Sequence, residues 1–239
     1  MTMVLLNNID HQDVRVIARG GREFGDGVNQ VMVFPTEFEQ VQREFPIVLR
    51  PDTEGRLRPV ALLGLDRDEN LFLGPDGGWQ CDHVPVLLQR GPFAIAKVGG
   101  ANDAPQVLID PDHPRISQTE GEPLFLEHGG NAPMLDKMLG ALQAAFVGSQ
   151  LLDPLFDALQ TSGLLRPLGL ELRVGPDHAY TISDALTVDR ERLAALSGDE
   201  LAALHRVGFL QSAFMIAASL GNLQRLVNRK AALLDRAAA

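Results

Sequence analysis

Glycine and proline punctuate the two halves of the chain differently, and this contrast limits the folds that the chain can adopt. Residues 1 to about 120 hold short apolar runs separated by Gly and Pro, whereas residues from about 131 onward are rich in Leu and Ala at helical spacing. Strands followed by helices, without regular alternation, are typical of an α+β fold and not of repeated βαβ units. We therefore predict an α+β protein with a β-rich N-terminal half, built from antiparallel hairpins, and a mainly helical C-terminal half that contains one inserted hairpin.

The length of the chain, 239 residues, suits one large domain or two small ones. We expect a single compact unit over residues 1–239. The segment at 110–123 is polar and contains prolines, which favours a loop and marks the best place for an internal boundary. Possible subdomains are therefore a β-rich part at 1–115 and a helical part at 130–239.

Composition and charge narrow the classes of partner. The net charge is −10, and the chain holds no cluster of Lys and Arg of the kind that grips phosphates, so we expect neither nucleic acid nor an anionic membrane as a partner. A single cysteine cannot form an internal disulfide. The first residues lack a basic segment and a long apolar run, and the apolar stretch 207–223 is shorter and more polar than a membrane span. These features predict a soluble, cytoplasmic protein.

Short apolar runs in the first half predict a helix and several strands. Thr36 and Glu39 have the spacing of a capping box at the start of a short helix. A glycine-rich turn in "GPDGGW" separates two runs and predicts a hairpin. The predicted strands are 47–50, 58–65, 70–74, 79–83, 91–98 and 105–110.

The second half predicts long helices around one hairpin. A helix should run over 133–159, with a break near Asp153-Pro154, and Gly163 suits the position after its end. Residues 165–174 and 178–183 form the predicted hairpin. Ser197 and Glu200 make a second capping box, and the helical pattern then continues from 200 to about 234 with a kink near Gly208 or Gly221.

Cys81 and His83 are the first candidates for chemistry. Residues two apart on a strand face the same way, so an imidazole could activate the thiol, or the two side chains could start a metal site. A zinc site usually needs four ligands, there is no other cysteine, and the histidines show no ligand spacing. We interpret the pair as part of a hairpin strand, and we assign no catalytic residue, metal or cofactor.

A polar stripe on the last helix is the second candidate. Gln211 and Asn222 differ by only about 20° around a helix, and Arg225 lies near the same line. Such a stripe could line a ligand pocket or a partner groove, and it could also be the solvent-facing side of an amphipathic helix. Our candidate ligand-binding residues are Arg90, His205, Gln211, Asn222 and Arg225.

Several segments together resemble the SapC family of bacterial proteins, over roughly residues 5 to 232. They are "EFPIVLR", "VALLGLDRDENLFLGPDGGW", "VPVLLQRGPF" and the closing "SLGNLQRL". The family usually has an aromatic residue where this chain has His83, and "RRYPF" where this chain has "LQRGPF". The reactive reading of Cys81 and His83 is weakened by this departure, whereas Trp79 matches the family pattern.

The resemblance implies a role more than a reaction. Genes of members look like companions of genes for halogenase-like proteins, cupin-like proteins and TonB-dependent receptors. The resemblance therefore implies a link to nutrient uptake or secondary metabolism. The family brings no catalytic residues to transfer, and its surface-layer name implies no location. We expect a non-catalytic accessory or binding protein whose partner is a protein or a small molecule. The alternative is an oxygen- or cofactor-dependent enzyme with a site between the two halves.

Overall fold

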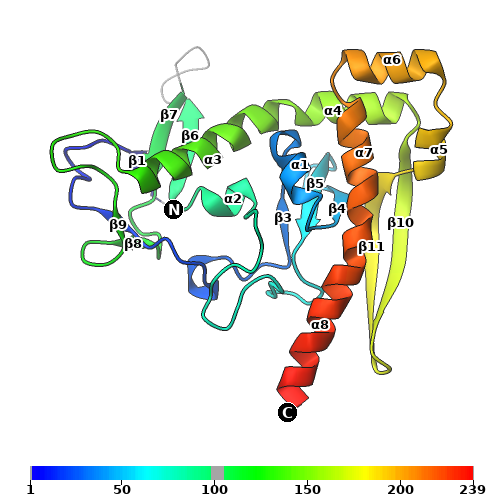
Figure 1. The fold of residues 1–239 in the computed structure, drawn as a ribbon. Coiled ribbons are helices and arrows are strands. Elements are labelled where there is room, and N and C mark those ends of the chain that lie inside the picture. The colour runs from blue at the N-terminus through cyan, green and yellow to red at the C-terminus, as the bar shows by residue number, and fades with distance from the viewer. Residues whose placement is uncertain (1, 98–104, 239) are drawn as a thin grey trace. The chain divides into compact units, whose positions relative to one another are not determined.

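The computed structural model describes residues 2–97 and 105–238, and its elements confirm the α+β class (Figure 1). The chain divides into two compact units, whose boundaries differ from those of the subdomains considered from the sequence. The first unit comprises Met1–Gly27, Leu73–Gln80 and Val84–Val147, and the second comprises Val28–Phe72, Cys81–His83 and Gly148–Ala239.

The first unit contains two small antiparallel sheets, with strand orders β1-β7-β6 and β8-β2-β9. Its strands are β1 (Val4–Leu5), β2 (Arg15–Val16), β6 (Phe93–Lys97), β7 (Pro105–Ile109), β8 (Ile116–Ser117) and β9 (Glu122–Pro123). Its short helices are η1 (Arg22–Phe24) and α2 (Val86–Gln89). The strands predicted at 91–98 and 105–110 are β6 and β7, although Val98 lies outside the described residues.

Helix α3 (Pro133–Gln150) supplies one side of the core of the first unit. Leu135, Met138 and Leu142 are buried at helical spacing on one face. They share an apolar cluster with buried residues of the two sheets and the loop after them, namely Val16, Phe93, Ile109 and Leu124. Each fully buried side chain of this size contributes about 1.5–3 kcal/mol by leaving water.

The predicted hairpin around Trp79 forms only in part. The turn is present, because the Gly74 nitrogen donates to the Gly78 carbonyl at 2.8 Å and Gly77 has a φ of +80°. The strands predicted at 70–74 and 79–83 are wrong, since the pairing is limited to a single bridge between Leu73 and Trp79. After that bridge, the backbone N–H groups of Asp82 and His83 donate to the side chain of Glu44 instead of to a neighbouring strand.

The second unit is built on a five-stranded antiparallel sheet with the order β10-β11-β4-β5-β3. Its strands are β3 (Gln30–Met32), β4 (Ile47–Pro51), β5 (Leu57–Leu62), β10 (Leu165–Val174) and β11 (His178–Val188). The predicted C-terminal hairpin is therefore confirmed, and it extends the sheet of the N-terminal strands through the pairing of Leu186 with Leu49.

The short helix before β4 begins one residue earlier than its predicted cap. It consists of η2 (Pro35–Glu37) and α1 (Phe38–Val41). The Thr36–Glu39 capping box is wrong, because Pro35 takes the first helical position and Glu37 then accepts from the Phe34 nitrogen at 3.2 Å. Glu39 pairs instead with Arg43 at 2.7 Å.

The predicted break in the long helix is confirmed. Helix α3 ends at Gln150 and α4 (Leu152–Thr161) follows, with Pro154 in the first turn of α4, where a missing N–H leaves no hydrogen bond unmade. Gly163 has a φ of +62° directly after α4, and the Leu164 nitrogen donates to the Leu159 carbonyl, as expected of a C-terminal cap.

The C-terminal helices are α5 (Arg190–Ala194), α6 (Gly198–Arg206), α7 (Leu210–Ser219), η3 (Leu220–Asn222) and α8 (Leu223–Ala238). Of these, α7 and α8 pack on the sheet of the second unit, and α5 and α6 contact α7. Ser197 and Glu200 form the predicted capping box of α6. Gly208, at a φ of +83°, separates α6 from α7. Helix α7 contacts β4 and β11, and α8 contacts β10 (Figure 1).

Among the described residues, no single helix has both the length and the apolar character of a membrane span. Helix α6 and the helical segment Leu210–Ala237 reach that length and character only when joined, and they are bent by 99° at their junction.

Candidate functional site

The thiol of Cys81 is held in its protonated form. Burial, together with the negative charge of Glu44, raises its pKa to about 12. Since the thiolate is the nucleophilic form, the surroundings of Cys81 oppose the activation considered from the sequence.

The imidazole of His83 contacts a carboxylate. The i, i+2 spacing suggested instead that it could activate the thiol of Cys81. Nε2 of His83 lies 2.9 Å from Oε2 of Glu37, which is almost completely buried. The backbone N–H groups of Asp82 and His83 both donate to Oε1 of Glu44, at 2.9 and 3.1 Å. Glu37 of η2 and Glu44 of the connection between α1 and β4 thus hold the 81–83 segment in place.

Most side chains of the polar stripe on the last helix make contacts within the protein. Asn222 donates from its side-chain amide to the carbonyls of Gln42 and Phe45, at 2.8 and 3.3 Å. The guanidinium of Arg225 lies 3.9 Å from the carboxylate of Glu44. These contacts account for the polarity of this part of the stripe, because the carbonyls after α1 need donors once they leave water.

Arg229 continues the stripe with another internal contact. Its guanidinium donates to the Leu71 carbonyl at 3.2 Å and lies 4.4 Å from the centre of the Phe72 ring. Burial lowers the pKa of Arg229. The side chain therefore joins α8 to the segment that follows β5.

The five candidate ligand-binding residues do not form one cluster. Arg90 belongs to the first unit, where it donates to the carbonyl of Phe93 and where burial lowers its pKa. The other four belong to the second unit. His205 is exposed on α6, whereas Asn222 and Arg225 contact the connection after α1. Gln211 lies in a different environment, at the beginning of α7.

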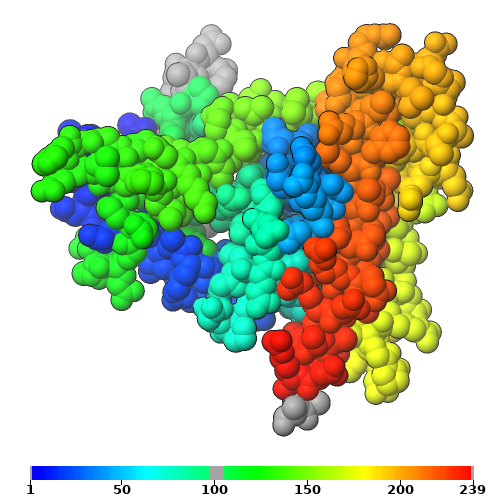
Figure 2. All heavy atoms as spheres, in the orientation of Figure 1, coloured from blue at the N-terminus to red at the C-terminus, as the bar shows by residue number. Residues whose placement is uncertain are grey.

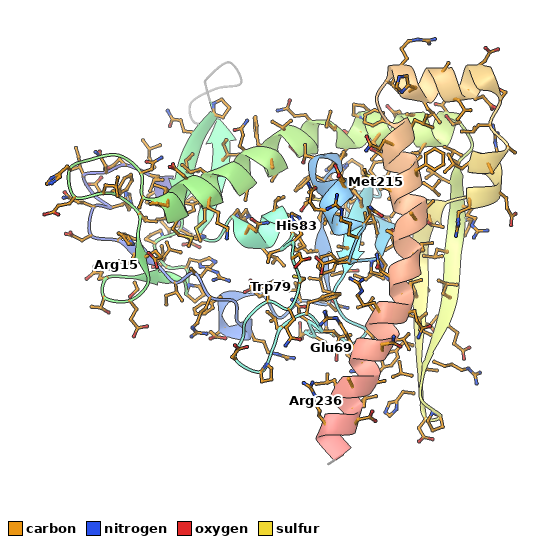
Figure 3. All side chains as sticks on the ribbon, viewed as in Figure 1. Arg15, Glu69, Trp79, His83, Met215 and Arg236 are labelled. Carbon is orange, nitrogen blue, oxygen red and sulfur yellow. The ribbon has the colours of Figure 1, made fainter. Side chains whose placement is uncertain are left out.

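Gln211 lines a cavity of about 250 Å³ between the start of α7 and the short helix η2–α1. We call it the α7 cavity. Figure 2 shows α1 beside α7, and Figure 3 labels Met215, which reaches the cavity from α7. The lining residues are Pro35, Thr36, Glu39, Gln40, Leu151, Gly208, Phe209, Gln211, Ser212 and Met215.

The α7 cavity lies at a helix N-terminus that has no side-chain cap. Phe209 occupies the N-cap position, and among the described residues no side chain accepts from the first turn of α7. The first N–H groups of a helix have no partner within the helix. Ser212, in that first turn, is 8% exposed and lines the cavity. The site therefore presents hydrogen-bond donors and a hydroxyl from one side.

Lys230 forms a charged cluster that the sequence did not reveal. Its ammonium lies 2.6 Å from Asp66 and 2.5 Å from Glu69, and it sits 5.6 Å from the Tyr180 ring (Figure 3 labels Glu69). Burial alone would lower the pKa of Lys230, but hydrogen bonds to the two carboxylates outweigh it and raise the pKa above its usual value. A lysine held as the cation joins α8 to the loop after β5.

Arg115 has a similar role in the first unit. Its guanidinium donates to the carbonyls of Ile17 and Arg19, at 2.9 and 2.6 Å, and pairs with buried Asp26 at 2.6 Å. It also lies 4.8 Å from the centre of the Phe24 ring. These charge-assisted hydrogen bonds hold the largely irregular segment 17–26 in place. Neither this pair nor the Lys230 cluster has a spacing in sequence that would have predicted it.

Within residues 2–97 and 105–238, no group of three or more His, Cys, Asp or Glu side chains could hold a metal ion. Comparison with curated proteins and with solved structures gives no match. A family model does match: the model of the SapC family aligns with residues 6–226, which is most of the chain and covers the larger part of each compact unit. The chain therefore belongs to the SapC family.

Proposed function

We propose that this SapC-family chain is a non-catalytic accessory protein that binds a small molecule in the α7 cavity. The observation that carries the proposal is the cavity itself, where uncapped N–H groups, the Ser212 hydroxyl and the Gln211 side chain converge beside apolar Leu151 and Met215. A pocket with an apolar wall and a few convergent polar groups is the usual form of a small-molecule site.

The surroundings of the reactive side chains agree with a binding role. Cys81 is kept as the thiol, Lys230 is kept as the cation by two carboxylates, and Asn222 bonds to backbone carbonyls. Lys230 and Asn222 thus serve contacts within the second unit. The link to nutrient uptake or secondary metabolism that family resemblance implies is part of the same proposal.

The test is a screen of a metabolite library against the purified chain, read by thermal shift and followed by mass spectrometry of the recovered compound. We expect at least one compound to raise Tm and to be recovered unchanged. The shift should be lost in Met215→Trp, which fills the cavity, and kept in Phe214→Trp, which changes an exposed neighbour on the same helix. Conversion of the compound to a product, or equal shifts in both variants, would contradict the proposal.

An enzyme is the second candidate, and the Glu37–His83 pair favours it. A buried carboxylate that orients an imidazole is one arrangement used to hold and transfer a proton. If the pair works in this way, a substrate found in the screen would be converted by the wild-type chain and not by His83→Gln, which keeps a hydrogen-bond donor but does not titrate.

A further inference from the structure

The geometry points to a specific class of ligand: we infer that the α7 cavity binds the carboxylate group of a small monoanionic organic acid. This inference rests on the proposed binding function and deepens it by naming the chemistry of the ligand. Two independent features of the cavity carry it. One is the uncapped start of a ten-residue helix, and the other is Ser212, which is 8% exposed, lines the cavity and has a hydroxyl that makes no hydrogen bond among the described residues.

The first feature is the N-terminus of α7. The chain turns at Gly208. The backbone N–H groups of Gly208 and Phe209 donate to the carbonyls of His205 and Leu204, respectively, at the end of α6. The N–H groups that follow, at the first three positions of α7, are the ones a helix leaves without internal acceptors. The helix dipole adds a partial positive charge there, so an oxygen anion is the favoured acceptor.

The second feature is the side chain of Ser212. It is 92% buried, because its exposed fraction is 8%, yet it lines the cavity. In the part of the chain that the structure describes, its hydroxyl makes no hydrogen bond, whereas Ser219 of the same helix donates to the Ile216 carbonyl at 2.7 Å. The hydroxyl is therefore open to the cavity, where a ligand oxygen could become its hydrogen-bond partner.

The charges around the cavity select a carboxylate over a phosphate. Of the described residues that line it, none is Lys or Arg, so a dianion would have no counter-charge. Glu39 is the charged lining residue, and its carboxylate is paired with Arg43 at 2.7 Å. A single negative charge at the start of α7 is therefore compatible with the site, and a double charge is not.

Shape and polarity limit the remainder of the ligand. A volume of about 250 Å³ lies below the range of about 300–1,000 Å³ that is typical of drug-sized ligands. Leu151, Phe209 and Met215 give the cavity an apolar wall, while the amides of Gln40 and Gln211 are polar. A short branched or aromatic acid satisfies both conditions.

The experiment uses the full chain and a matched pair of probes, 3-methylbutanoate and 3-methylbutanamide, titrated at pH 7 by ligand-observed NMR. We expect the acid to bind with a Kd of about 1 mM or lower and the amide at least about tenfold more weakly. Inorganic sulfate, which is a dianion at pH 7, should not displace the acid. Equal affinity for the acid and the amide, or displacement by sulfate, would overturn the inference, as would an acid Kd weaker than about 10 mM.

Two variants locate the anion. Ser212→Ala should weaken acid binding about fivefold to tenfold, as expected for one hydrogen bond to a charged group, with little change for the amide. Ser212→Asp places a carboxylate at the third position of α7, so it should abolish acid binding and raise Tm by about 1–3 °C. Gln160→Ala, an exposed glutamine on α4, is the control and should bind like the wild type. Unchanged acid affinity in both serine variants would refute the assignment.

The failure of this inference differs from the failure of the proposed function. If neutral compounds from the metabolite screen raise Tm through the cavity while the acid does not bind, the chain is a binding protein and the carboxylate assignment is wrong. If the acid binds as described but is also converted, the assignment holds and the non-catalytic role is wrong.

Discussion

The imidazole Nε2 of His83 lies 2.9 Å from Oε2 of Glu37, a carboxylate that is only 2% exposed. This contact joins the segment after Trp79 to the start of the helix that precedes β4. Because the carboxylate is buried and the imidazole is a side-chain partner to it, the contact suits a test of stability.

We expect His83→Ala to lower the free energy of unfolding by about 1–3 kcal/mol, because the buried Glu37 carboxylate loses a hydrogen-bond partner. The measurement is urea denaturation at pH 7. His205→Ala, which changes an exposed histidine on α6, should alter stability by no more than about 0.5 kcal/mol. Equal effects of the two substitutions would show that the contact contributes nothing.

The Lys230 cluster should contribute more. Lys230→Met leaves Glu69 buried without its cation and should destabilise the fold by about 3 kcal/mol, somewhat less than a fully buried pair because Asp66 is half-exposed. Lys137→Met, on the exposed face of α3, serves as the matched control and should have little effect. A similar midpoint in urea for both variants would argue against a stabilising role.

Two glycines of α3 should respond in opposite directions to the same substitution. A Cβ at Gly148 would lie 2.4 Å from the Cβ of Phe34, so Gly148→Ala should destabilise by about 1–3 kcal/mol. A Cβ at Gly140 would meet nothing within 4 Å, so Gly140→Ala should stabilise by about 0.5–1 kcal/mol through helix propensity. Thermal unfolding measures both, and a gain in Tm for Gly148→Ala would contradict the close approach.

Cys81 should be unreactive at neutral pH. With a pKa of about 12, the thiolate fraction at pH 8 is at least about a hundredfold below that of a free cysteine. Alkylation by iodoacetamide at pH 8, followed by mass spectrometry of the folded chain, should be slower by a similar factor, and it should recover in urea. A rate like that of free cysteine would show that the thiol is activated after all.

Glu200 gives a prediction about pH. A hydrogen bond from the Arg192 guanidinium and the contacts with Ser197 lower its pKa from 4.5 to about 2. A lowered folded-state pKa means that the carboxylate stabilises the fold above pH 4.5 and that this contribution is lost as the pH falls towards 2. The difference in Tm between wild type and Glu200→Gln should therefore be largest near pH 6 and shrink below pH 4.5. A difference that grows on acidification would reverse the assignment.

The sequence by itself determined much of the local structure of this protein. The turn before Trp79, the end of α4 at Gly163, the capping box of Ser197 and the break at Gly208 were all readable, because each depends on a few neighbouring residues. Glycine at positive φ and serine at an N-cap act within one turn of chain. The same local evidence was enough for the α+β class and for family resemblance.

Local evidence failed where a distant residue decided the outcome. The strand predicted at 79–83 lost its backbone donors to Glu44, about 40 positions earlier, and the polarity of Asn222 is explained by carbonyls at 42 and 45. The sequence indicated a polar stripe that includes Gln211, but the cavity that Gln211 lines depends on the approach of α1 to α7. Only the tertiary structure decided these points, because a side chain's hydrogen-bond partner depends on which backbone groups the fold brings beside it.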